Sequence, residues 1–199
     1  MLTIFINYYL KLFFIMTPFF VLSSFLAMTT GMKAERRQKI ALKVALAVLV
    51  SSFALFFFGK YIFALFGITL DAFRIGAGSV LFLSALSMIN GRESVDAEYS
   101  HNDIAVVPLA IPITVGPGVI GVLMVMGAEV QSPGKLLLLC GALAAASLTI
   151  GLLLYSAEWL QGYLGEKSLT VLQKVTGLFV SAIAAQIIFT GIKGFLVNQ

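Results

Sequence analysis

The stretch VVPLAIPITVGPGVI, residues 106–120, decides how this chain folds. It carries no charged residue, so it belongs in an apolar environment, yet it holds Pro108, Pro112 and Pro117 within ten residues. Proline removes a backbone hydrogen-bond donor and its ring clashes with the preceding helical turn. The stretch therefore predicts a helix that breaks at membrane depth, where irregular backbone is tolerated only if protein covers it or water lines it.

Composition places the whole chain in a membrane. Of its 199 residues, 60% are hydrophobic and 11% are charged, against roughly 45–50% and about 25% in soluble domains. A bilayer-spanning helix needs about 20 apolar residues, whereas a barrel would show short alternating segments. The sequence predicts an all-α integral membrane protein with six transmembrane helices, at about residues 2–28, 40–66, 70–89, 104–127, 136–160 and 169–197.

The basic residues predict how the chain is oriented. The first loop holds Lys33, Arg36, Arg37 and Lys39, and loops on that side carry most of the 13 basic residues. Because basic loops stay cytoplasmic, we expect both termini to lie outside the cytoplasm. We expect no nucleic-acid binding, since no basic stripe with interleaved aromatic residues lies outside the apolar runs.

The two halves of the chain resemble each other at an offset of 99 residues. Pro18 then falls on Pro117, and Gly78 falls on Gly177. Each half has three spans, which is an odd number, so the second half must enter the membrane in the opposite direction. We predict a 3+3 inverted-topology repeat with broken first and fourth helices, formed by residues 1–90 and 105–199 and joined by a polar linker at 91–104. The alternative is that any two apolar helices align passably.

Matching breaks in two repeats predict a central binding site. A helix N-terminus attracts an anionic group and exposed carbonyls attract an ammonium group, so two facing breaks suit a zwitterionic amino acid. Hydroxyls at the breaks and one amide near the middle of the sixth run add polar contacts. The predicted substrate-binding residues are Thr17, Pro18, Pro112, Thr114, Gly116, Pro117, Gly118 and Gln186. For Gln186, bonding to a neighbouring helix is an equal alternative.

Other polar residues give little sign of further chemistry. Asp71 and Arg74 lie one helical turn apart. This spacing predicts either an ion pair at the membrane interface or a gate. His101 is the only histidine and lies in a loop, no HExxH motif occurs, and Cys140 is the only cysteine. We therefore expect no metal, no cofactor and no enzymatic activity.

Three motifs resemble those of the MarC family of bacterial inner-membrane proteins. VVPLAIPITVGPGVI is similar to its PLAxPxxxGPG signature, FGITLDAFRIGAG to its FGIS…FRIAGG segment, and VTGLFVSAIAAQIIFTGIKG to its ending. The resemblance covers nearly the whole chain. It implies six spans, a place in the bacterial inner (plasma) membrane, and transport of small neutral amino acids such as glycine and alanine.

One segment departs from that family pattern. The family's first half usually carries Asp-Pro or Asn-Pro followed by Gly–Asn or a similar polar pair. Here the segment reads Thr17, Pro18, Phe19, Phe20, Val21, which predicts an altered substrate size or altered ion coupling. The leading hypothesis is a secondary transporter. A channel, a structural membrane partner and an exporter of another small solute are the alternatives, while self-association and coupling to H⁺ or Na⁺ stay open.

Overall fold

The computed structural model describes residues 1–91, 109–110, 113–130 and 132–197, and every regular element among them is helical. Two short helices begin the chain, separated by a break at Thr17. They are followed by two long helices, and three more lie after residue 116. The bounds are α1 Leu2–Ile15, α2 Pro18–Met28, α3 Ala34–Phe66, α4 Leu70–Asn90, α5 Pro117–Glu129, α6 Pro133–Tyr155 and α7 Ala157–Val197.

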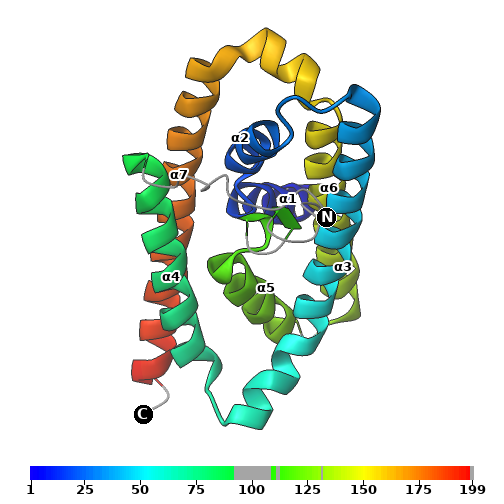
Figure 1. Cartoon of the computed structure of the whole chain (residues 1–199). Helices are drawn as coiled ribbons and strands as arrows, with labels where there is room; N and C mark the ends of the chain where they lie inside the picture. Colours follow the sequence, from blue (N-terminus) through cyan, green and yellow to red (C-terminus); the bar gives the residue numbers. More distant parts are fainter. Residues whose placement is uncertain (92–108, 111–112, 131, 198–199) are drawn as a thin grey trace.

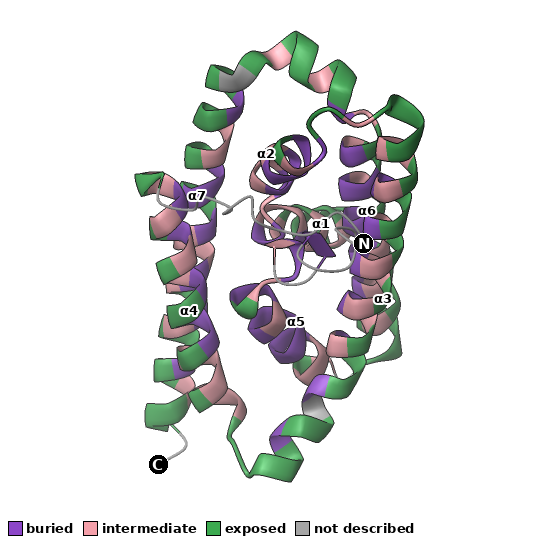
Figure 2. Cartoon of the chain, in the orientation of Figure 1, coloured by how far each residue is buried: buried purple, intermediate pink, exposed green. Residues whose placement is uncertain are grey.

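The long helices form two pairs that flank the short ones. Figure 1 shows α4 with α7 on one side, α3 with α6 on the other, and α1, α2 and α5 between them. The core lies around the short helices, where Leu22 and Phe25 of α2 and Leu123 of α5 are buried (Figure 2). Large apolar side chains such as Leu83 and Phe189 instead point outward, as expected of helices that face lipid.

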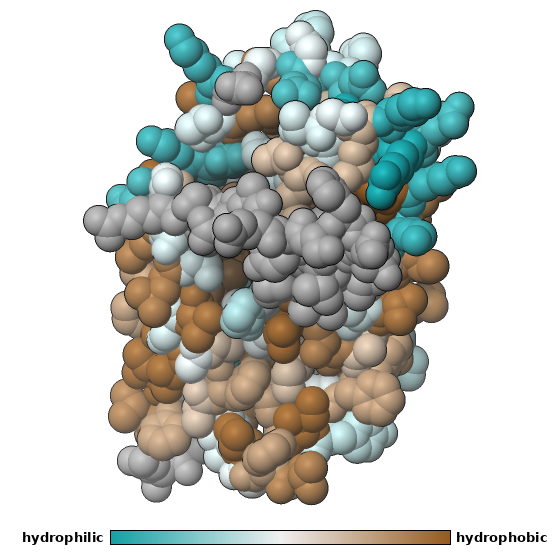
Figure 3. Space-filling view, viewed as in Figure 1, coloured by the Kyte–Doolittle hydropathy of each residue, from teal (hydrophilic) through white to brown (hydrophobic). Residues whose placement is uncertain are grey.

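In the part of the chain that the structure describes, five segments are long and apolar enough to cross a membrane, namely Leu2–Met28, Ala34–Gly59, Leu70–Asn90, Pro133–Tyr155 and Lys167–Val197. Helix α5 is apolar but has only 13 residues, fewer than the roughly 17–25 that a span requires. The rest of the predicted fourth span, like the linker at 91–104, falls largely outside the described residues, so the count of six spans stays a prediction. Figure 3 shows hydrophilic residues gathered at the end that holds the start of α3 and the bend of α7.

Two helices begin earlier than hydropathy predicts. Helix α3 begins at Ala34 instead of residue 40, because Glu35, Arg36 and Arg37 are good helix formers and the acidic side chain suits the first turn. Helix α7 begins at Ala157 instead of residue 169 and bends at Gly165, whose φ of 67° and ψ of 164° are not helical. Hydropathy locates apolar surface and misses helical turns that extend into the polar region.

Helices α4 and α7 run antiparallel, and their contacts are reciprocal. A Cβ on Gly78 would lie 2.7 Å from Cγ1 of Ile188, and a Cβ on Gly177 would lie 2.9 Å from Cγ1 of Ile89. Each glycine also faces the carbonyl oxygen of an alanine, at Ala184 and Ala85 respectively. The paired positions differ by 99 residues in every case, so exchanging α4 with α7 reproduces the contact.

Candidate functional site: a cavity between two helix breaks

The first break lies at Thr17. Helix α1 ends at Ile15, and α2 begins at Pro18, whose lack of an N–H costs nothing at a first helical position. Thr17 has φ of 48° and ψ of 57°, in the left-handed region, and it is the only non-glycine residue with positive φ among those described. A β-branched residue rarely adopts this conformation, so the break is held against local strain.

The second break repeats this arrangement at Gly116. Helix α5 also begins with a proline, Pro117, and Gly116 before it is extended. Upstream, the hydroxyl of Thr114 donates to the carbonyl oxygen of Leu109 at 2.7 Å, and the Val115 N–H donates to the Ala110 oxygen at 2.9 Å. Among the described residues, regular α-helix therefore begins at Pro117, and the prediction of a broken fourth span stays a prediction.

Both breaks border one cavity of about 250 Å³. Thr17 and Phe20 line it from the first break, and residues 116–119 line it from the second. Leu81, Ser84, Ala85 and Met88 of α4 form one wall, while Val180 of α7, which is 99 residues beyond Leu81, adds to the lining. None of the described lining residues is charged, so the cavity suits a small solute without net charge.

The electrostatics of the cavity come from helix ends. Among the described residues, no side chain caps the N-terminus of α2 or of α5, and the first N–H groups of a helix lack intrahelical acceptors. The first turns of α2 and α5 both border the cavity, through Phe20 of α2 and through Gly118 and Val119 of α5. Ile15, in the last turn of α1, brings the carbonyl end of a helix to the same space. Helix ends of both polarities therefore border the cavity, and a helix N-terminus favours a carboxylate while a C-terminus favours an ammonium group.

The predicted site residues divide into three groups. Thr17, Gly116, Pro117 and Gly118 line the cavity, and Pro18 is buried beside it. Thr114 is fully buried with its hydroxyl bonded to backbone, so it shapes the break. Gln186 lines a different cavity, and Pro112 lies outside the described residues. The assignment of these residues to solute binding stays a prediction.

The sequence alone did not predict that residues of α4 line the site, although these residues recur at helical intervals. Leu81, Ser84, Ala85 and Met88 recur at helical intervals of three and four residues, so they share one face. Ser84 is half-buried and adds a hydroxyl to this wall. No local signal indicates which face of this apolar helix meets the breaks.

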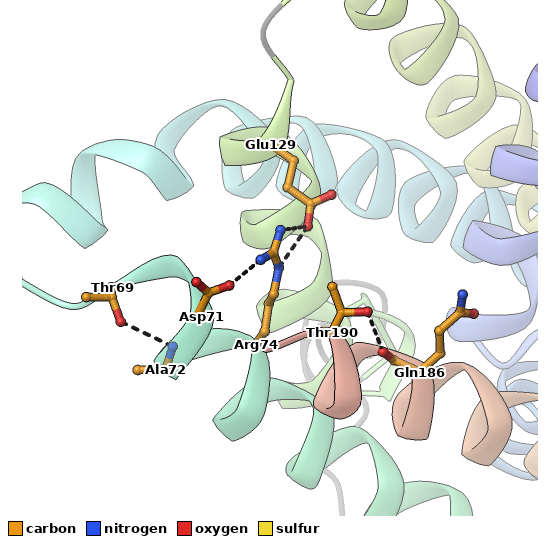
Figure 4. Close-up of polar contacts among 7 residues, drawn as sticks. All are labelled: Thr69, Asp71, Ala72, Arg74, Glu129, Gln186 and Thr190. Atoms are coloured by element: carbon orange, nitrogen blue, oxygen red, sulfur yellow. Dashed lines mark hydrogen bonds and ion pairs between the residues drawn. The ribbon is translucent and has the colours of Figure 1, made fainter. Parts of the chain in front are cut away.

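A polar cluster lies at the far end of α5 (Figure 4). Nε and Nη2 of Arg74 donate to Oε1 of Glu129 at 3.0 and 2.7 Å, and Nη1 donates to Asp71. Arg74 therefore contacts a second helix besides pairing with Asp71 on its own helix, and Glu129 holds α5 to α4. Lys11, Gln186 and Thr190 line a cavity of about 140 Å³ beside this pair.

The strain at Thr17 gives a testable prediction. We expect Thr17→Asn to raise the free energy of unfolding by about 1 kcal/mol, because asparagine tolerates positive φ better than a β-branched residue. Thermal unfolding in detergent measures the change. Thr190→Asn is the control, since Thr190 has helical φ and should gain nothing. Equal responses of the two variants would show that the strain is absent.

Comparison with known proteins places this arrangement in a family context. A family model described as MarC family integral membrane protein matches residues 2–196. A UPF0056 membrane protein of Methanocaldococcus jannaschii is 35% identical, with 96% of this chain and 97% of that protein covered. The UPF0056 membrane proteins YhcE of Escherichia coli and YvbG of Bacillus subtilis are 32% and 31% identical, with 96% and 98% of this chain and 93% and 96% of those proteins covered. No solved structure matches.

Proposed function

The chain belongs to the MarC family of integral membrane proteins, and on that premise we propose that it carries small neutral amino acids across the membrane by alternating access. One observation carries the proposal: the N-termini of α2 and α5, which no described side chain caps, border one cavity whose described lining residues carry no charge. Interrupted helices whose N-termini point at a solute carboxylate are a recurring device of secondary transporters.

The volume and chemistry of the cavity support a small zwitterion. About 250 Å³ lies below the roughly 300–1,000 Å³ of pockets for drug-sized ligands. Phe20, Leu81 and Met88 give apolar walls that leave little space for a long side chain. Glycine or alanine would place its carboxylate at the N–H groups of α2 and α5 and its ammonium group toward the carbonyl end of α1.

The reciprocal packing of α4 and α7 supports the inverted repeat that alternating access needs. In an inverted repeat the third spans of the two halves, here α4 and α7, must run in opposite directions, as they do. The contacts of Gly78 on α7 match those of Gly177 on α4. Helices α3 and α6 begin at Ala34 and Pro133, which again differ by 99 residues. We propose that the two halves rock about the shared cavity, in the plasma membrane and with both termini outside the cytoplasm.

Counterflow in proteoliposomes tests the proposal. We expect vesicles preloaded with unlabelled glycine to accumulate labelled glycine transiently, and external alanine to compete. Glutamate and lysine should not compete, because no charged side chain is among the described lining residues. Flux without saturation or counterflow would indicate a channel, and no exchange through folded, inserted protein would contradict the amino-acid assignment.

A further inference from the structure

Two polar connections tie the α4–α7 pair to the two helices that start at the breaks. On α4, Arg74 contacts Glu129 at the end of α5, with its Nη2 2.7 Å from Oε1. On α7, Nε2 of Gln173 lies 2.5 Å from Oγ of Ser23 and donates to the Phe19 carbonyl oxygen of α2 at 3.4 Å. Each connection joins a long helix to a short one whose N-terminus borders the cavity.

The long-helix residues of the two connections occupy equivalent positions in the two halves. Gln173 stands 99 residues after Arg74, as Val180 does after Leu81. Leu81 and Val180 line the central cavity, and each follows its connecting residue by seven positions, or about 10 Å along a helix. Arg74 and Gln173 are therefore placed symmetrically about the cavity, whereas their partners Glu129 and Ser23 are not related by the same offset.

The antiparallel course of α4 and α7 puts these connections at opposite ends of the pair. A Cβ on Gly191 would lie 2.9 Å from Cβ of Arg74, so Arg74 sits beside the C-terminal part of α7. Gly177 faces Met88 and Ile89 near the C-terminal end of α4, and Gln173 lies one turn further along. Since α4 has 21 residues, or about 30 Å, the two ends reach opposite membrane surfaces.

We propose that Arg74–Glu129 and Gln173–Ser23 are the two gates of the carrier, one on each side of the central cavity. The inference rests on the proposed function and adds the residues that control access. Breaking Arg74–Glu129 frees the end of α5 from α4 and opens the cavity toward one surface. Breaking Gln173–Ser23 frees α2 from α7 and opens it toward the other. Both connections are made in this structure.

The gates differ in chemistry, since one is a partly exposed ion pair and the other consists of neutral hydrogen bonds. Arg74 makes charge-assisted bonds, which are roughly twice as strong as neutral ones, and Asp71 holds its guanidinium from the same helix. Gln173 makes neutral bonds to a hydroxyl and a carbonyl.

Sided chemical labelling tests the gates without knowledge of the solute. Cys140 is the only cysteine, so Cys140→Ala gives a thiol-free background into which Ser84→Cys places one thiol at the cavity wall. A membrane-impermeant maleimide is applied from each side of oriented vesicles. We expect Glu129→Gln to raise the labelling rate at least fivefold from one side only, and Gln173→Leu to do so from the opposite side only.

Milder variants guard against misfolding. Glu129→Asp shortens the acid by one methylene, and Ser23→Ala removes only a hydroxyl, so both should fold and show the same sidedness with smaller increases. Connections that merely hold helices together would raise labelling equally from both sides or leave it unchanged, and either result overturns the inference. Sided labelling without glycine counterflow would contradict the proposed solute but not the gates. Counterflow without sided labelling would contradict the gates alone.

Discussion

Replacing Gly116 with leucine should lower counterflow at least 100-fold while the protein still folds and inserts. Gly116 is half-buried, lines the central cavity and precedes α5 with φ of −75° and ψ of 173°. Any residue adopts this extended conformation, so the backbone tolerates the change. A leucine side chain there would fill the space beside the N–H groups of Gly118 and Val119, where we place the solute carboxylate.

The control for this variant is Gly162→Leu. Gly162 is exposed in the first turns of α7, and a Cβ there meets nothing within 4 Å, so transport should stay close to that of the unaltered protein. Size-exclusion profiles in detergent and protein recovery from the membrane report folding for both variants. Normal flux through monodisperse Gly116→Leu would place the solute path elsewhere and remove the central cavity from the mechanism.

The breaks could be predicted from sequence because their cause is local. Proline has no N–H to donate wherever it stands, so Pro18 and Pro117 mark helix starts in any tertiary setting, and both helices do begin there. The left-handed conformation of Thr17 could not be predicted in the same way. A threonine predicts negative φ, so no local pattern indicates the positive value found at Thr17.

The polar partners could not be predicted because they depend on tertiary packing. Asp71 and Arg74 are three residues apart, and the helical period alone pairs them. Glu129 is 55 residues from Arg74, and nothing in the intervening sequence indicates that the end of α5 meets the first turn of α4. Gln186 illustrates the same point, since its position in the sixth apolar run gave no sign that it faces the smaller cavity.

The departure at Phe20 acquires a physical meaning from its position. The resemblance to the family suggested that a small and polar pair is usual after the first proline, and here Phe20 lines the cavity while Val21 is fully buried. An aromatic ring at the cavity wall reduces the volume left for a solute side chain. The departure therefore fits the preference for glycine and alanine that we propose, and it does not remove the helix break.

The close contact between α3 and α5 is where a single added methyl group should destabilise the fold most. A Cβ on Gly127 would overlap the carbonyl oxygen of Phe56, and a Cβ on Gly59 would lie 2.6 Å from Cα of Met124. These neighbours are backbone atoms, which cannot rotate away as a side chain end can. Since overpacking a close interface costs about 1–3 kcal/mol and sometimes more, we expect Gly127→Ala to lower the unfolding temperature markedly.

The matched control is Gly134→Ala, in the first turn of α6, where a Cβ meets nothing within 4 Å. Alanine is a better helix former than glycine by about 1 kcal/mol, so this variant should be neutral or slightly more stable. Thermal unfolding in detergent compares the two, and Gly59→Ala should behave like Gly127→Ala because it separates the same helices. If Gly127→Ala were as stable as Gly134→Ala, α5 could not lie this close to α3. The position of α5, on which the cavity and the Glu129 gate both depend, would then be wrong.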